Sequence, residues 1–214
     1  PRDDGPKRFR PAELGWDLPA DTEVRFLACL GGFVGSDILA GLMATKLAES
    51  DALIGLIDLG TNGEIVFGTR ERMVCASTAA GPAFEGGRIS CGMRAATGAI
   101  SEVSLGGGKL VYNVIGQGQA RGICGSGLVD AVACGLELGR IQPSGKLSGG
   151  LFGLSPSLSL TQADIREVQL AKGAIAAGAR ILLKRLGAEL GDVRRLYLAG
   201  AFGNYINRES ARRI

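Results

Sequence analysis

The residues with the clearest chemical potential surround one short turn. Asp58 interrupts an otherwise apolar run, residues 53–59, and stands at the entrance of a glycine-bearing turn. The turn consists of Gly60, Thr61, Asn62 and Gly63. Glycine lets backbone N–H groups approach a phosphate, and a carboxylate at the end of a strand can hold a metal ion or its bound water. The same stretch is also compatible with a β-hairpin in which Asn62-Gly63 only reverses the chain.

A few other polar residues lie at positions from which they could contact a ligand. Asp37 falls in the first turn of a predicted helix, where an acid also simply favours the helix dipole. Glu64 and Glu85 lie beside glycine turns. Gln169 and Lys172 are three residues apart on a predicted long helix, so their side chains share a face. That face could contact a ligand or could be solvated.

The composition narrows the chemistry. The 214 residues include no histidine, which excludes Ser-His and Cys-His nucleophiles and histidine metal sites. The five cysteines show no zinc or iron–sulfur spacing and favour reduced thiols in a cytoplasmic protein. The 24 basic residues are scattered among 21 acids, so we expect no nucleic-acid partner. No apolar run approaches the ~20 residues of a membrane-spanning helix, and we expect no membrane association.

Hydrophobic patterning predicts an α/β fold around the turn. Strands are predicted at 24–30, 53–59, 65–67, 73–78, 100–105, 109–115 and 194–199, and helices at 37–49, after the glycine turn 122–127, from Thr161 to about Gly187 and from about Asn207. The strands at 53–78 should form a meander. Thr161 and Asp164 form a variant capping box at the start of the longest helix. Ser36 and Ser126 are the predicted N-caps of two other helices.

The remaining segments are predicted to be irregular. Residues 1–22 contain four prolines and are predicted to be an extended lead-in, with Trp16 and Leu18 docking on the body. Residues 79–100 form a long stretch rich in glycine and small residues, which in a compact domain is usually functional or packed. Residues 142–160 are predicted to be a loop because they are rich in Ser, Gly and Pro. A loop, 200–204, follows the last predicted strand.

Five sequence blocks occur in an order that resembles a known family. They are DLGTNGEI, AAGPAFEGG, GICGSGL, TQADIREVQLAK and LAGAFGNYI. Together they look like the C-terminal ATP-binding domain of the reductive activators of corrinoid proteins. That family lies within the superfamily of acetate and sugar kinases, heat-shock chaperones and actin. The resemblance implies a ribonuclease-H-like lobe of an actin/chaperone-type ATPase fold, with a central mixed sheet and flanking helices.

The resemblance also implies a division of the chain. Residues 1–22 are then a lead-in or linker, residues 23–50 the last strand of a first lobe plus the helix that connects the lobes, and residues 51–214 the second lobe. The family's first phosphate hairpin and its iron–sulfur cysteines have no counterpart here, so we expect a chain truncated at both ends. A [2Fe-2S] cluster is expected only in a full-length parent.

Residue roles follow from the resemblance, position by position. The turn residues Gly60 to Gly63 bind a nucleotide phosphate, Asp58 holds Mg²⁺ through water, and Asp37 is the second acid of the catalytic site or orients the attacking water. Gln169 and Lys172 flank the adenine. The remaining predicted contacts with ATP come from glycine-containing segments after strands, namely Gly81, Gly86, Gly87, Gly200, Ala201, Gly203 and Asn204. The role of Gly125-Ser126-Gly127 stays open between anion binding and a packed turn.

Three functions remain in competition. The first is the nucleotide-binding domain of an ATP-dependent activator that restores the Co(I) state of a corrinoid protein, its expected partner. The second is a small-molecule or sugar kinase of the same superfamily, and the third is an interaction module that has lost ATP. We expect the isolated chain to bind Mg-ATP weakly and to be inactive, because one phosphate hairpin is absent. A homodimer is a further expectation.

Overall fold

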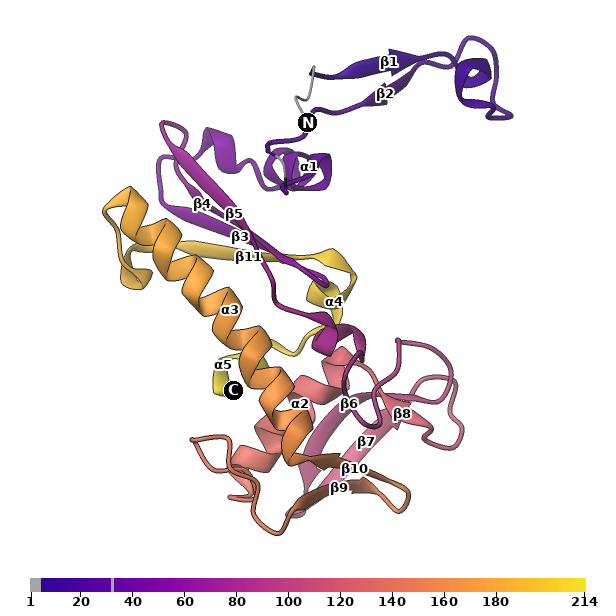
Figure 1. Ribbon diagram of the computed structural model, residues 1–214, viewed down its shortest axis with the longest axis vertical. Helices are drawn as coiled ribbons and strands as arrows, with labels where there is room; N and C mark the ends of the chain where they lie inside the picture. The colour runs from indigo at the N-terminus through magenta and orange to yellow at the C-terminus, as the bar shows by residue number, and fades with distance from the viewer. Residues whose placement is uncertain (1–4, 32) are drawn as a thin grey trace.

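The computed structural model describes residues 5–31 and 33–214 (Figure 1). The chain forms two packed halves joined by one long helix, with a small hairpin projecting from one end (Figure 1). Within these described residues, we find no helix with the length and apolar character needed to cross a membrane.

The first half is built on a four-stranded mixed sheet with strand order β11-β3-β4-β5. Its strands are β3 (Ile54–Leu59), β4 (Gly63–Gly68), β5 (Met73–Thr78) and β11 (Arg195–Ala199). Strands β3, β4 and β5 pair antiparallel, which confirms the predicted meander, whereas β11 lies parallel to β3. The near-continuous apolar run of β3 is explained by burial on both faces of the sheet.

Two helices cover the sheet, one on each face. Helix α1 (Ser36–Thr45) packs through Ile38 and Leu42 on one face, and α3 (Gln162–Leu186) packs on the other. A Cβ atom at Gly41 would lie 2.9 Å from Leu56 Cδ2. The glycine inside α1 therefore permits close approach of the helix to β3, at a cost in helix propensity of about 1 kcal/mol.

The second half combines a small sheet, a buried helix and a hairpin. The elements are β6 (Ala99–Gly106), β7 (Lys109–Val114), β8 (Gly122–Ile123), α2 (Gly125–Glu137), β9 (Leu151–Ser155) and β10 (Leu158–Thr161). The sheet has order β7-β6-β8, and α2 packs against β6. Helix α3 starts beside β10 and continues along the first sheet, so one helix spans both halves (Figure 1).

The N-terminal residues form a hairpin rather than a simple lead-in. Strand β1 (Lys7–Phe9) pairs antiparallel with β2 (Val24–Phe26), and a 3-10 helix, Pro11–Leu14, lies between them. Trp16 packs on Phe26, with ring centroids 6.4 Å apart, and about half of the Trp16 surface is exposed. The prediction that Trp16 and Leu18 dock on the body is therefore wrong, because the projecting hairpin supplies its own aromatic contacts (Figure 1).

Two predicted loops are regular structure. The predicted loop 142–160 contains the β9-β10 hairpin, in which Phe152, Leu154 and Leu160 are buried. The predicted loop 200–204 is a short helix, α4 (Gly200–Tyr205), followed by α5 (Arg208–Arg213). The helix expected near Asn207 is thus confirmed, with Asn207 as its N-cap.

Helix boundaries differ in detail from the prediction. The helix predicted over 37–49 ends at Thr45, because Lys46 adopts a left-handed conformation with φ 53°, and a 3-10 turn, Leu47–Glu49, follows. Gly35 and Cys124 occupy the N-cap positions predicted for Ser36 and Ser126. The Thr161–Asp164 capping box of α3 is confirmed, and Gly187 ends that helix with φ 72°.

Candidate functional site

Asp58 lies in an acidic environment at the end of β3. The sheet register places it beside Glu64 of β4 and Ala199 of β11. Burial raises the pKa of the Asp58 carboxyl, and the nearby charges of Asp37 and Glu64 raise the pKa further. The carboxylates from α1, β3 and β4 therefore repel one another, and a bound cation would reduce this repulsion.

Each neighbouring acid is held by its own hydrogen bond. The Asp37 carboxylate accepts the Ile38 N–H at 2.9 Å, at the start of α1. The Glu64 carboxylate accepts the Ser77 hydroxyl at 2.9 Å, across the β4-β5 pair. The described residues contain no group of three or more His, Cys, Asp or Glu side chains placed to hold a metal ion. The geometry thus offers Asp58 as a single carboxylate for a cation that brings other ligands with it.

Gly200 closes the site on the β11 side. It begins α4 with φ +82°, and a Cβ atom at this position would lie 2.4 Å from Asp58 Oδ1. The β11-α4 junction therefore approaches the carboxylate more closely than any side chain would allow. Gly200 was predicted to contact the nucleotide from a loop, and in the structure it lies beside Asp58 at the start of a helix.

The tip of the turn presents unused donors. Gly60 N–H bonds to Asn62 O at 3.0 Å, which folds the turn. The side chains of Thr61 and Asn62 are exposed, and in the described part of the chain their amides make no hydrogen bond. Gly63, in contrast, is packed, since a Cβ atom there would meet Thr78 Oγ1 at 2.9 Å. Two adjacent free amides and a hydroxyl are a group of donors suited to an anion.

The segment that follows β5 contacts the tip of the turn. The Gly81 amide donates to Thr61 O at 2.9 Å. The Thr61 hydroxyl faces both carboxylate oxygens of Glu85, each 2.8 Å away, at the end of the 3-10 helix Pro82–Glu85. Residues 24 apart in sequence therefore meet at the tip of the turn.

The three glycines of this segment have different environments. Gly81 has φ +79° and open space around it, which leaves room for a ligand. A Cβ atom at Gly86 would lie 2.6 Å from Met93 N, and one at Gly87 would lie 2.7 Å from Pro82 Cβ. Gly86 and Gly87 therefore have a packing role that accounts for them without a ligand.

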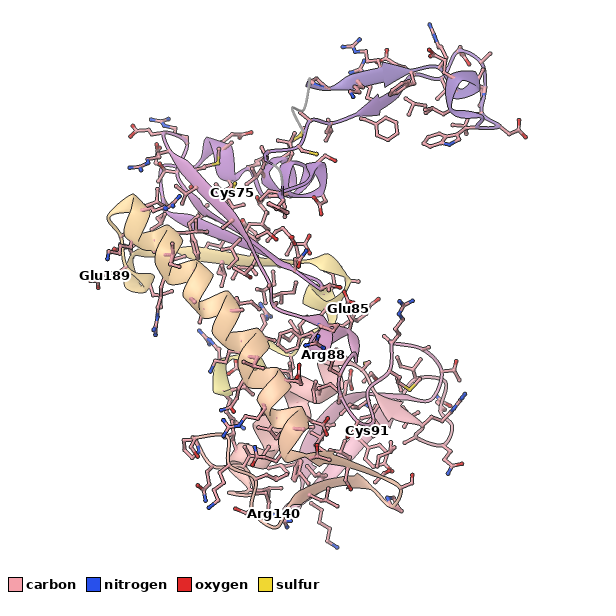
Figure 2. All side chains as sticks on the ribbon, in the orientation of Figure 1. Cys75, Glu85, Arg88, Cys91, Arg140 and Glu189 are labelled. Atoms are coloured by element: carbon pink, nitrogen blue, oxygen red, sulfur yellow. The ribbon has the colours of Figure 1, made fainter. Side chains whose placement is uncertain are left out.

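A cavity of about 630 Å³ opens next to Glu85. It is lined by the 3-10 helix at 82–85, β6, the start of α2 and helix α4, and its lining includes Phe84, Ser101, Glu102, Cys124, Gly125, Ser126, Ala201, Phe202 and Tyr205. Phe84 and Phe202 stack with centroids 4.9 Å apart and form an aromatic wall. Figure 2 shows Glu85 and Arg88 between the two halves of the molecule. The volume suits a small organic ligand.

The start of α2 is tightly fitted beside this cavity. A Cβ atom at Gly125 would lie 1.9 Å from Phe84 O, so only glycine is accommodated there. The Ser126 hydroxyl donates to Ser101 O at 2.7 Å. Gly125 and Ser126 therefore combine a packing role with a place in the cavity wall.

Gln169 and Lys172 lie away from this cavity. Gln169 Nε2 donates to Ser144 O at 3.0 Å, and its Oε1 accepts from Arg166. Lys172 Nζ donates to Ile214 O. Neither residue belongs to the cavity lining, so their predicted position beside an adenine has no support from this geometry.

The other α4 residues that were predicted to contact ATP lie in different environments. Ala201 lines the cavity. Gly203 faces β11, because a Cβ atom there would lie 3.2 Å from Leu198 C. Asn204 is exposed and outside the cavity lining. The sequence prediction missed the aromatic wall, although Phe84 and Phe202 each stand inside one of its glycine-containing blocks.

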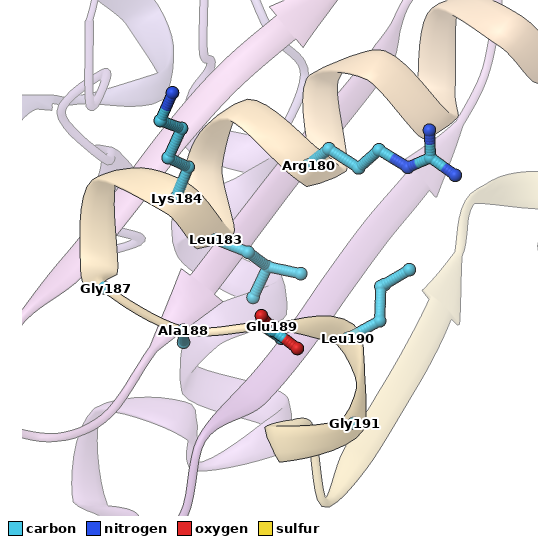
Figure 3. Close-up of a pocket in the computed structure, with 8 residues that line it drawn as sticks. All are labelled: Arg180, Leu183, Lys184, Gly187, Ala188, Glu189, Leu190 and Gly191. Atoms are coloured by element: carbon cyan, nitrogen blue, oxygen red, sulfur yellow. The ribbon is translucent and has the colours of Figure 1, made fainter.

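A second pocket of about 520 Å³ lies at the far end of α3 (Figure 3). Arg180, Leu183, Lys184 and residues 187–191 line it. Figure 3 shows the Arg180 and Lys184 side chains pointing to different sides, so their charges do not converge on one ligand. We therefore place the candidate site at the Asp58 turn and the adjoining cavity.

The fold places the chain in a class of protein that the comparisons identify. The chain belongs to the family described as the C-terminal ASKHA domain of RACo, which matches residues 52–153 and 152–214. The α/β architecture, with a mixed central sheet flanked by helices, is that of this domain.

Three relatives are named for the activation or reduction of corrinoid proteins. The corrinoid activation enzyme RamQ of Eubacterium limosum is 39% identical over 89% of this chain and 37% of its own length. A reductase of the Co(II) methylated amine-specific corrinoid protein in Methanosarcina barkeri is 34% identical over 85% of this chain and 38% of its own length. The solved structure of a reductive activator for a corrinoid, iron-sulfur protein matches with a TM-score of 0.83 and 35% identity, over 95% of this chain and 36% of that one. The chain thus spans less than two-fifths of these relatives.

Proposed function

We propose that this chain is the nucleotide-binding lobe of an ATP-dependent reductive activator, which restores the Co(I) state of a corrinoid protein. One observation carries the proposal for the site. The free amides of Thr61 and Asn62, the Asp58 carboxylate and a cavity with an aromatic wall adjoin one another at the junction of the two halves. A nucleotide needs these three environments for its phosphates, its cation and its nucleoside.

The phosphates are assigned to the tip of the turn. In this proposal the Thr61 and Asn62 amides and the Thr61 hydroxyl donate to phosphate oxygens. Gly60 and Gly63 shape the turn that points these donors outward, and Gly81 leaves the approach open. When bound, the nucleotide would supply free energy for the proposed reduction. The protein positions the phosphate chain and neutralises its charge.

Asp58 is assigned to Mg²⁺. Magnesium is usually held by one or two carboxylates together with substrate phosphates and water. The acid environment of Asp58 fits this requirement, because Asp37 and Glu64 add negative potential without forming a closed protein cage in the described residues. Asp37 then acts on the cation or on its bound water through this potential.

The nucleoside is assigned to the cavity between the 3-10 helix at 82–85 and α4. Ala201 and the stacked pair Phe84–Phe202 offer an apolar surface, and Ser101, Glu102 and Ser126 offer polar groups around it. Gly200 and Gly203 position α4 for this role. Burial of a flat base against such a surface is the interaction that the cavity supports best.

The rest of the activity is assigned to a longer protein. The names of the relatives indicate corrinoid proteins as their targets, and we propose the same class of partner here. The [2Fe-2S] cluster that the family resemblance implies is proposed for another part of that protein, and the five cysteines of this chain lack cluster spacing. A cytoplasmic location and a homodimer are also proposed.

Calorimetric titration of the full-length protein with Mg-ATP tests the site. We expect Asp58→Asn to weaken Mg-ATP binding by at least tenfold and to leave the affinity for adenosine nearly unchanged, because the cation contact is lost and the cavity is retained. Glu71→Gln, on the exposed turn between β4 and β5, is the matched control for removal of one acid charge. Equal affinity of Asp58→Asn and the unchanged protein for Mg-ATP would contradict the assignment.

A further inference from the structure

The contact between Thr61 and Glu85 places an anion on one donor of the turn, the Thr61 hydroxyl. Both Glu85 carboxylate oxygens lie 2.8 Å from Thr61 Oγ1. A Cβ atom added to Gly60 would lie 3.9 Å from Glu85 Oε1, so the carboxylate extends over the turn itself. A carboxylate and a phosphate accept the same hydrogen-bond donors, and both carry negative charge.

Glu85 is poorly compensated in this position. No basic side chain in the described residues forms an ion pair with it. Among the described residues, the Thr61 hydroxyl is the one hydrogen-bond donor to the Glu85 carboxylate, and the Glu85 side chain is exposed. A contact of this kind is weak enough to be exchanged for another.

The segment that carries Glu85 also connects the two parts of the site. Glu85 ends the 3-10 helix at 82–85 and lines the cavity, and Phe84 of the same helix stacks on Phe202 of α4. The backbone bond from Gly81 N–H to Thr61 O remains when the side chain moves, because it involves neither carboxylate oxygen. The carboxylate can thus leave Thr61 while the segment stays docked on the turn.

We propose that Glu85 is a displaceable carboxylate, which occupies the anion position at Thr61 in the absence of ligand and must be displaced by an incoming phosphate. This inference rests on the proposed function and adds a regulatory contact to it. The wild-type affinity for phosphate-bearing ligands is therefore lower than the donors of the turn alone would give.

Glu85→Gln tests the displacement. Glutamine keeps the size and one acceptor of glutamate but removes the charge that competes with phosphate. We expect the full-length Glu85→Gln protein to bind Mg-ATP roughly two- to tenfold more tightly than the unchanged protein, with adenosine affinity unaltered. Glu71→Gln should alter neither affinity. Thr61→Val removes the shared hydroxyl, so most of the gain from Glu85→Gln should disappear in the double variant.

Magnesium pyrophosphate separates this inference from the proposed function, because it has phosphates but no nucleoside. Tighter binding of pyrophosphate by Glu85→Gln, with no binding of ATP, would support the displaceable carboxylate and reject the nucleotide assignment. Weaker binding of either ligand by Glu85→Gln, or no difference from the unchanged protein, would overturn the displaceable carboxylate. An equal gain for adenosine and Mg-ATP would also overturn it, since the effect would then lie in the cavity.

Discussion

Substitution of Gly200 by alanine should destabilise the protein through contact with Asp58. Gly200 has φ +82°, a left-handed conformation that costs a non-glycine residue about 1–2 kcal/mol. The added Cβ atom would stand 2.4 Å from Asp58 Oδ1 and 3.1 Å from Leu59 O. Such overpacking costs about 1–3 kcal/mol. We therefore expect a loss of roughly 3 kcal/mol in the free energy of unfolding.

Thermal and urea unfolding would measure this loss. For a domain of this size, about 3 kcal/mol corresponds to a fall of roughly 6–12 °C in Tm. Gly191→Ala is the matched control, because no atom lies within 4 Å of its added Cβ and its φ is not left-handed. That control should change the free energy of unfolding by less than about 0.5 kcal/mol.

A double variant separates the two costs. In an Asp58→Ala background the Oδ1 contact is absent, so Gly200→Ala should cost about 1–2 kcal/mol, from the left-handed conformation and the remaining contact with Leu59 O. The interpretation would be refuted if Gly200→Ala were as stable as Gly191→Ala. An equal cost in both backgrounds would show that the approach of α4 to Asp58 contributes nothing, and the geometry of the site would then need revision.

Three further substitutions should change the stability of the protein, two through charge and one through helix propensity. Asp164→Asn should cost about 2–3 kcal/mol at pH 7, because the carboxylate accepts four hydrogen bonds from Ser90 and Thr161. Burial alone would raise the Asp164 pKa, but these hydrogen bonds lower the pKa overall. The contribution of the Asp164 carboxylate to the free energy of unfolding should therefore vanish as the pH falls below about 4. Urea unfolding at a series of pH values measures this loss. Asp58 has a raised pKa, so its ionisation should reduce stability as pH rises above about 4, and Asp58→Asn should unfold at a higher temperature at pH 7. Gly173→Ala should stabilise α3 by about 1 kcal/mol in the same assay, since its added Cβ meets no atom within 4 Å.

The elements that the sequence predicts well are those with strong local patterns. The apolar runs on both sides of Asn62-Gly63 predict β3 and β4, because a strand buried on both faces needs such runs. The capping box at Thr161 and the helical spacing of apolar residues predict α3. In contrast, the β9-β10 hairpin was predicted as a loop, since Ser, Gly and Pro obscure a few apolar residues that only the packed core makes informative.

The candidate site depends more on tertiary contacts than on local pattern. Asp58 and its turn could be predicted from one stretch of sequence. The Glu85 contact with Thr61 could not, because it joins residues 24 apart at an irregular segment. The spacing of Gln169 and Lys172 indicates a shared helix face, but the side to which that face turns depends on how α3 packs, and here it turns toward Ser144 and Ile214.

The charges at the turn determine which form of ligand the site favours. Asp58 is held near Asp37 and Glu64, and its raised pKa reflects burial and this repulsion. A phosphate without a cation would add negative charge to the same region and would also have to displace Glu85 from Thr61. A cation without a phosphate would find no group of three or more ligating side chains in the described residues. The arrangement therefore favours a cation–phosphate pair over either component alone, and the affinity for nucleotide should depend steeply on magnesium concentration.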